Sequence, residues 1–108
     1  MSDSRSQEDA LKEKFHNKMI EIYKIADKEY GYRPTRFLNL LSELGGVETA
    51  KNLINKAEAT DGFTKLWELN RLDLSVEALV IAEEFQPLFT DKEIETCKNR
   101  LAEYGYFD

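Results

Sequence analysis

Histidine and cysteine are the side chains that most often bind metals or act as nucleophiles, and this chain has one of each, His16 and Cys97. A zinc or other transition-metal site needs three or four His, Cys or carboxylate ligands, and these two residues fall in different predicted helices. His16 lies beside an apolar stripe, which indicates a histidine at the edge of a helix face. Cys97 falls within such a stripe, where cysteine behaves as a small apolar residue. The sequence therefore predicts no metal site, no cofactor and no nucleophilic cysteine.

Neighbouring carboxylates are a second source of chemistry, because two such groups can share general acid and base roles. Charged residues make up 33% of this chain, so acidic pairs are expected on solvated faces. We predict solvent exposure, and assign no catalytic residue, for three such pairs: Glu83–Glu84, Glu93 with Glu95, and Asp73 with Glu77. An enzyme site built from carboxylates and arginine alone, such as Asp73 and Glu77 with Arg71, stays open as an alternative.

The double glycine Gly45-Gly46 resembles a phosphate-binding loop only superficially. It follows a predicted helix rather than a strand, and it lacks the Lys-Ser/Thr pair that would hold phosphate and magnesium. We interpret it as a helix end. Residues 37–54 also have the helix, glycine turn, helix outline of a helix-turn-helix unit. Its second helix would present nearly neutral side chains, so sequence-specific DNA binding by this unit is disfavoured.

The charge of the chain is unevenly distributed. Residues 1–36 contain eight bases against seven acids, whereas residues 37–108 contain seven bases against fourteen acids. An acidic surface repels a phosphate backbone, so nucleic acid is an unlikely partner for the molecule as a whole. The best candidate for touching a phosphate or a stacked base is a turn that combines cations with flat rings: Tyr30, Tyr32, Arg33 and Arg36.

The stretch DGFTKLWELNRLDLSVEALV, residues 61–80, combines the only tryptophan with a dense run of apolar side chains. Most of this stretch is spaced to cover a core from a short helix, a turn and a following helix. Asp61 and Ser75 are placed as helix caps, and Arg71 with Asp73 can clamp the turn by a charge-assisted hydrogen bond. Trp67 and Arg71 are also the residue types that most often anchor protein interfaces. An exposed Trp67 would therefore favour an interface.

Apolar residues recur at helical spacing throughout the chain. The first helix is expected from about residue 7 to 29 with Ser6 as its N-cap, and Gly31 and Pro34 separate it from the second. Further helices are expected from Pro34 to Gly45, from Val47 to about Lys56, briefly after Gly62, from Ser75 to Glu84 before Pro87, and from Thr90 to Gly105. We predict an all-α, compact bundle of five to six short-to-medium helices with no sheet. Residues 1–6 are expected to form a frayed tail and residues 7–108 a single helical domain.

The last helix has the clearest start, because Thr90 and Glu93 form a capping-box pattern. No apolar run approaches the roughly 20 residues that cross a bilayer. The first residues, MSDSRSQED, lack a secretory or lipidation pattern. With a single cysteine, these features predict a cytoplasmic protein without a membrane segment.

The segments YGYRPTRFLNLLSELGGVETAKNLI, DGFTKLWELNRLDLSVEALV and LFTDKEIETCKNRLAEYGY resemble a small, uncharacterised all-α domain family of bacteria and phages. The similarity covers nearly the whole chain after the first helix, and GFTKLWELNRLDLSVEAL is its most specific part. The family occurs alone or attached to nuclease-like, mobile-element or defence-associated proteins. The resemblance implies an accessory role and carries over no catalytic residue.

Three classes of function follow from these features. We favour a non-catalytic protein–protein interaction module in a bacterial defence or phage counter-defence system, whose protein partner and oligomeric state the sequence leaves open. The alternatives are an accessory nucleic-acid-binding domain, which would use the basic first helix and the Tyr30 to Arg36 turn, and an enzyme with a carboxylate and arginine site. The residues assigned to partner binding are Tyr30, Tyr32, Arg33, Arg36, Trp67 and Arg71.

Overall fold

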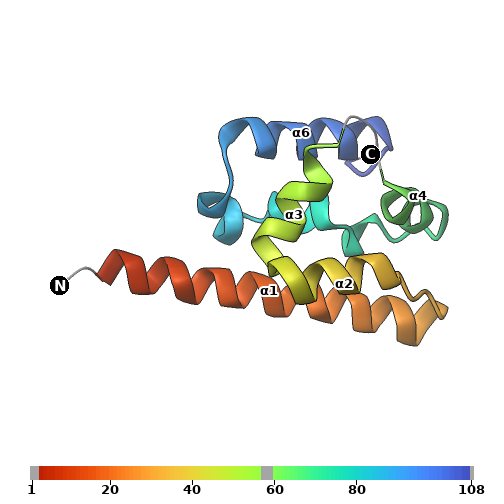
Figure 1. The fold of residues 1–108 in the computed structure, drawn as a ribbon. Helices are drawn as coiled ribbons and strands as arrows, with labels where there is room; N and C mark the ends of the chain where they lie inside the picture. The colour runs from red at the N-terminus through yellow and green to blue at the C-terminus, as the bar shows by residue number, and fades with distance from the viewer. Residues whose placement is uncertain (1–2, 57–59, 108) are drawn as a thin grey trace. The chain divides into compact units, whose positions relative to one another are not determined.

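The protein is all-α, as the sequence predicts. A computed structural model describes residues 3–56 and 60–107, with the side chains of residues 3–6 excluded, and contains no strand in these ranges. It has six α-helices and two short 3-10 helices within them (Figure 1): α1 (Asp3–Tyr30), α2 (Thr35–Leu44), α3 (Gly46–Ile54), α4 (Asp61–Glu68), η1 (Leu72–Leu74), α5 (Val76–Val80), η2 (Glu83–Leu88) and α6 (Asp91–Glu103). Within the described ranges, no helix is both long and apolar enough to cross a bilayer.

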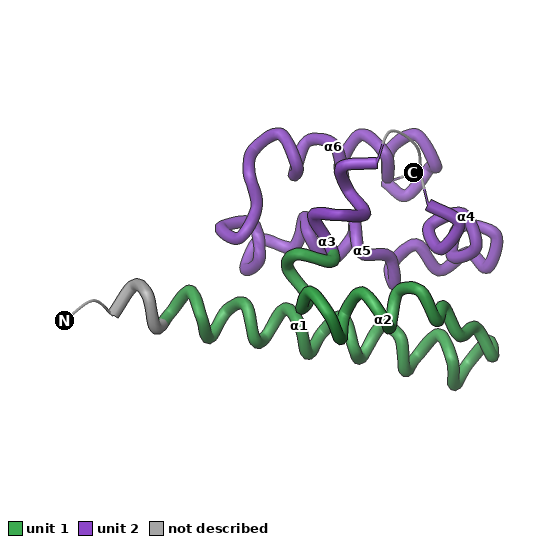
Figure 2. The backbone as a smooth tube through the Cα atoms, in the orientation of Figure 1, with its two compact units in different colours: residues 1–49 green, residues 50–108 purple. Residues whose placement is uncertain are grey.

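The chain divides into two compact units, Met1–Thr49 and Ala50–Asp108 (Figure 2). The first unit contains α1 and α2, and the second contains the helices from α4 to α6. The division falls within α3. The expectation of one domain over residues 7–108 stays a prediction, and the two units are described separately here.

The long helix α1 dominates the first unit. It begins at Asp3 rather than near residue 7, so Ser6 lies within the helix and does not cap it, and the predicted tail overlaps α1 from Asp3 onward. Phe15, Met19 and Ala26 on the predicted apolar stripe are buried. The helix ends at Gly31, whose φ of 65° is left-handed and whose N–H donates to the Asp27 carbonyl at 2.8 Å, so the predicted glycine stop is confirmed.

The two glycines after α2 have different roles. Gly45 ends α2 with a φ of 82°, a conformation that favours glycine. Gly46 is the first residue of α3 and lies against α1, because a Cβ at this position would be 2.6 Å from the His16 Cα. A single residue separates α2 from α3, which is shorter than the three- to four-residue turn of a helix-turn-helix unit.

Polar side chains set the helix starts of the second unit. Thr60 caps α4 by accepting the Phe63 N–H at 3.2 Å, so the predicted cap at Asp61 is wrong and Asp61 is instead the first helical residue. Ser75 caps α5 as predicted, accepting the Ala78 N–H at 3.1 Å. The predicted capping box of α6 is confirmed, with Thr90 and Glu93 exchanging hydrogen bonds.

The predicted helix from Ser75 to Glu84 is too long. α5 ends at Val80, and Ala82 takes an extended ψ of 129° that interrupts the helical hydrogen bonds. The Gln86 side-chain amide donates to the Ile81 carbonyl at 2.8 Å and so satisfies an acceptor at the end of α5. Pro87 therefore lies within the separate 3-10 helix η2 rather than after one continuous helix.

The core of the second unit is built from the apolar faces of these helices, and α5 packs against η1 and α6. Phe85, Ile54 and Leu101 are its largest fully buried apolar side chains. Leu72 and Leu74, the two ends of η1, are also buried.

Candidate functional site

The candidate site is an open pocket at one end of the second unit. Its volume is about 280 Å³, and seven residues from the ends of α4 and α6 and from η1 line it: Trp67, Asn70, Leu72, Asp73, Tyr104, Gly105 and Tyr106. Asp73 is the one acidic residue in this lining. The pocket thus combines aromatic side chains with one carboxylate, whose charge Arg71 partly balances.

Trp67 lines the pocket, and 47% of it is exposed. Its ring meets that of Tyr104 at a centroid distance of 5.4 Å and an angle of 83°, an edge-to-face contact that stabilises aromatic pairs. Tyr104 also packs edge-to-face on the buried Phe63 at 4.9 Å. Trp67 is therefore held against the core through Tyr104 while much of its own surface faces solvent.

The end of α4 explains how Asn70 reaches the pocket. The Arg71 N–H donates to the Leu66 carbonyl at 2.8 Å, and the Asn70 N–H donates to the Trp67 carbonyl at 3.0 Å. These two bonds define a Schellman motif, which needs a left-handed residue after the helix. Asn70 fills that position with a φ of 61°. The tight reversal brings the chain back past Trp67.

The end of α6 repeats the same motif. The Tyr106 N–H donates to the Leu101 carbonyl at 2.9 Å, the Gly105 N–H donates to the Ala102 carbonyl at 3.1 Å, and Gly105 has a φ of 79°. The motif fixes Tyr106 beside the pocket, where its ring lies 5.2 Å from that of Phe107. Two helix C-termini consequently end at one pocket.

Asp73 is positioned by Arg71, as the sequence predicts. The Arg71 Nε donates to Oδ1 at 3.0 Å, and Nη2 donates to Oδ2 at 3.1 Å. This bidentate geometry holds the carboxylate in one orientation while 52% of the Asp73 side chain stays exposed. Arg71 does not itself line the pocket.

The other predicted partner-binding residues lie in the first unit, around the turn after α1. Tyr30, Arg33 and Arg36 are exposed, and Tyr32 is half-buried. The Arg33 Nε donates to the Asp27 carboxylate at 2.8 Å, and this bond, with the charge of Asp27, raises the pKa of Arg33. Part of the positive charge of the turn is thus matched by an acid.

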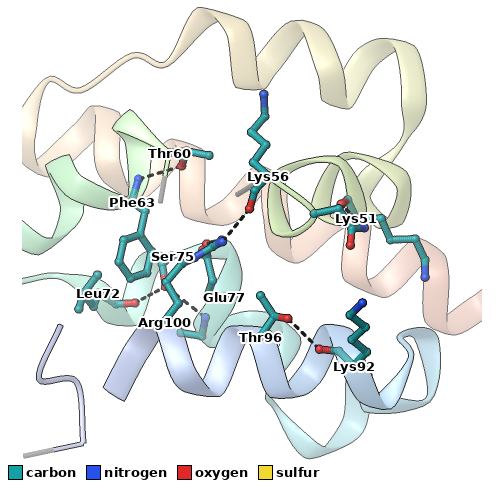
Figure 3. A network of polar contacts seen from close by, with 12 residues as sticks. Lys51, Lys56, Thr60, Phe63, Leu72, Ser75, Glu77, Lys92, Thr96 and Arg100 are labelled. Atoms are coloured by element: carbon teal, nitrogen blue, oxygen red, sulfur yellow. Dashed lines mark hydrogen bonds and ion pairs between the residues drawn. The ribbon is translucent and has the colours of Figure 1, made fainter. Parts of the chain in front are cut away.

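Glu77 is buried, contrary to the prediction that it lies on a solvated face with Asp73. Its Oε2 accepts a hydrogen bond from the Arg100 Nη1 at 2.9 Å, and Arg100 also donates to the Lys56 carbonyl at 3.1 Å (Figure 3). Burial raises the pKa of Glu77, and the bond from Arg100 opposes this effect. The Glu77–Arg100 pair joins α5 to α6 inside the second unit, and neither residue lines the pocket.

Glu93 is also buried, so its prediction as a solvated partner of Glu95 is wrong. Its carboxylate accepts hydrogen bonds from Lys51 at 2.8 Å, from Asn55 at 3.2 Å and from the Thr90 N–H at 3.0 Å. Burial acts to raise the pKa of Glu93, but these donors outweigh it and the pKa is lowered. Glu93 thus links α3 to the start of α6.

The two residues with the most obvious chemistry have structural environments. His16 is half-buried on α1, and Cys97 is fully buried on α6. Burial, with the nearby Glu77 charge, raises the pKa of the Cys97 thiol to about 12, which keeps it protonated at neutral pH. No group of three or more His, Cys, Asp or Glu side chains within residues 7–56 and 60–107 is arranged to hold a metal ion.

Sequence reasoning named Trp67 and Arg71 but missed the pocket residues Asn70, Tyr104 and Tyr106. The sequence feature that could have predicted them is the aromatic run around Gly105, which comprises Tyr104, Tyr106 and Phe107. A glycine stop followed by Tyr106 and Phe107 places rings directly after a helix end, where a core cannot easily cover them.

No protein-family model, no curated protein and no solved structure matches this chain. The resemblance of residues 30–106 to a bacterial and phage domain family therefore stays a prediction.

Proposed function

We propose that this protein is a non-catalytic protein–protein interaction module of a bacterial defence or phage counter-defence system. Its binding surface is the aromatic face of the second unit, formed by Trp67, Tyr104, Tyr106 and Phe107. The observation that carries the proposal is the 47% exposure of Trp67, the only tryptophan in the chain. An exposed tryptophan beside other exposed rings is typical of an interaction site.

The aromatic face has the properties of an interface anchor. Phe107 is 56% exposed and Tyr106 37%, so three large rings offer apolar surface to a partner. Aromatic side chains bring a large contact area with few rotatable bonds, which lowers the entropy cost of binding. The Trp67–Tyr104 contact and the two Schellman motifs also hold this surface in place before a partner arrives.

The alternatives are less well supported by the described contacts. The Arg33–Asp27 ion pair reduces the charge that the turn after α1 can offer to a phosphate. The predicted enzyme site would need Asp73, Glu77 and Arg71 in one pocket. Glu77 is instead paired with Arg100, and of the three residues only Asp73 lines the pocket.

The experiment is site-specific photo-crosslinking in the native host. A photo-crosslinking residue replaces Phe107, at the edge of the aromatic face, and in a matched control it replaces Lys98, an exposed residue of α6. We expect a discrete protein adduct from position 107 that disappears when Trp67→Ala is added, and no such adduct from position 98. Equal adducts from both positions, or an adduct that persists with Trp67→Ala, would refute this function.

A further inference from the structure

We propose that the pocket beside Trp67 binds an arginine side chain of the partner protein. This inference rests on the proposed function and names the chemistry that the aromatic face recognises. The pocket joins three features that each favour a cation: perpendicular aromatic walls, the Asp73 carboxylate and the C-terminal ends of two helices.

The first feature is the pair of aromatic side chains that line the pocket. Trp67 and Tyr104 both line the pocket, and their ring planes meet at 83°. A flat cation that enters the pocket therefore lies beside both rings. The face of an aromatic ring carries partial negative charge, and tryptophan attracts cations most strongly. The guanidinium group of arginine is planar and weakly hydrated, so it stacks on such rings more readily than an ammonium group does.

The helix ends supply the second feature. α4 ends at Glu68, and Leu69 and Asn70 follow it directly. α6 ends at Glu103, and Tyr104 and Gly105 follow it directly. The C-terminus of a helix carries partial negative charge on its unpaired carbonyls. The two Schellman motifs pair the Leu66, Trp67, Leu101 and Ala102 carbonyls, so only a part of this charge remains at each helix end. Asn70 and Gly105 both line the pocket, so both negative helix ends lie at its wall. This remaining partial charge favours a cation over an anion.

The Asp73 carboxylate is the third feature, and its pairing with Arg71 leaves room for a second donor. Each carboxylate oxygen has two acceptor positions, and Arg71 uses one on each oxygen. With 52% of the side chain exposed, the remaining positions are open to solvent. Arg71 is thus a positioning residue that orients Asp73, and an incoming guanidinium can donate to the free positions.

The size of the pocket and the charge around it fit a single basic side chain. About 280 Å³ lies just below the range of roughly 300 to 1,000 Å³ that is usual for drug-sized ligands. Residues 50–108 contain seven bases against twelve acids, so the second unit attracts a basic segment. The partner we infer is therefore a protein whose basic segment inserts one arginine beside Trp67.

The test is a titration of the intact protein with three blocked tripeptides that differ in one side chain: Gly-Arg-Gly, Gly-Lys-Gly and Gly-citrulline-Gly. Citrulline has nearly the shape of arginine without its charge. Because the chain has one tryptophan, its indole N–H gives a single resonance in a heteronuclear NMR spectrum. We expect saturable shifts of this resonance and of the Gly105 amide with the arginine peptide, and binding weaker by about fivefold or more with citrulline.

Two variants and a matched control locate the site. Asp73→Asn keeps the side-chain shape and is expected to weaken binding of the arginine peptide by about threefold or more. Trp67→Phe keeps an aromatic ring and should weaken it less than Trp67→Ala does. Glu95→Gln removes the same charge from an exposed position of α6 that lies nine residues, or roughly 13 Å along the helix axis, before Tyr104, and it should leave binding unchanged.

The outcomes separate this inference from the function on which it rests. Equal binding of the arginine and citrulline peptides, lysine binding as tight as arginine, or no saturable shift at all overturns the arginine assignment. The photo-crosslink from position 107 would still stand in each case and keep the interaction module. Loss of that crosslink, together with arginine binding at the pocket, would overturn the module while it keeps the site.

Discussion

Replacing Arg100 by methionine tests the buried ion pair that holds α5 to α6. The side chains of Arg100 and Glu77 are only 8% and 4% exposed, and their charged atoms lie 2.9 Å apart. Arg100→Met keeps the volume and the apolar stem but leaves the Glu77 carboxylate without its cation. Breaking a buried pair in this way costs about 3 to 5 kcal/mol, because a charge stays buried without compensation. We expect a loss of that size at neutral pH.

The loss should depend on pH. Burial already raises the pKa of Glu77, and Arg100→Met removes the bond that opposes this effect. The folded variant then binds a proton at Glu77 more tightly than the unfolded chain does, where a glutamate has a pKa of about 4.3. Its stability from this group is fully present below the unfolded pKa and is lost as pH rises through the raised folded pKa. The deficit of the variant is therefore smaller near pH 4 than near pH 7.

The assay is urea unfolding followed by far-ultraviolet circular dichroism, at about pH 4 and about pH 7. Lys98→Met is the matched control, since it removes a base from an exposed position on the same helix and should change the unfolding free energy by less than about 0.5 kcal/mol. A loss below about 1 kcal/mol for Arg100→Met at neutral pH, or a loss that does not grow with pH, would show that the pair does not act as described.

Three further predictions concern Glu93, Cys97 and the arginines of the turn after α1. The pKa of Glu93 is lowered because its bonds to Lys51 and the α6 cap outweigh burial, so its stabilisation is present above the unfolded pKa and lost as pH falls through the lower folded pKa. Glu93→Gln should cost about 1 kcal/mol at neutral pH and flatten the acid limb of a pH–stability curve. Cys97, with its pKa raised to about 12, should react with a thiol reagent only after urea unfolds the protein. A fluorescence titration with DNA and RNA should show no submicromolar binding at about 0.15 M salt, and Arg33→Ala with Arg36→Ala should lower any salt slope by roughly 1 to 2.

Local signals in the sequence predicted the features that depend on nearby residues. The stripe of α1, the stop at Gly31 and the capping box of Thr90 all follow from side chains within one or two helical turns. The Arg71–Asp73 clamp was predictable for the same reason, since its partners are two residues apart. In each case the physical cause lies within the segment.

The features that sequence reasoning missed depend on residues far apart in the chain. Arg100 and Glu77 are separated by 23 positions, and no spacing rule relates them. Trp67 lies four residues after the buried Phe63, and this spacing predicts that both side chains share a core face. The ring of Tyr104, which directly follows α6, packs against both of these rings. Trp67 is thereby left half exposed, and Trp67→Ala should cost less than the roughly 3 to 5 kcal/mol of a buried ring.

The most direct test of the central claim is the affinity of the partner captured from position 107 for the purified protein and for its Trp67→Ala variant, measured by calorimetry. Leu44→Ala is the control, because Leu44 is also an exposed apolar side chain, at 44%, and belongs to the first unit rather than to the aromatic face. Removal of an interface anchor costs at least about 2 kcal/mol, so Trp67→Ala should weaken binding by roughly 30-fold while Leu44→Ala leaves it unchanged. An unchanged affinity for a correctly folded Trp67→Ala variant would contradict the assignment of the aromatic face as the binding surface.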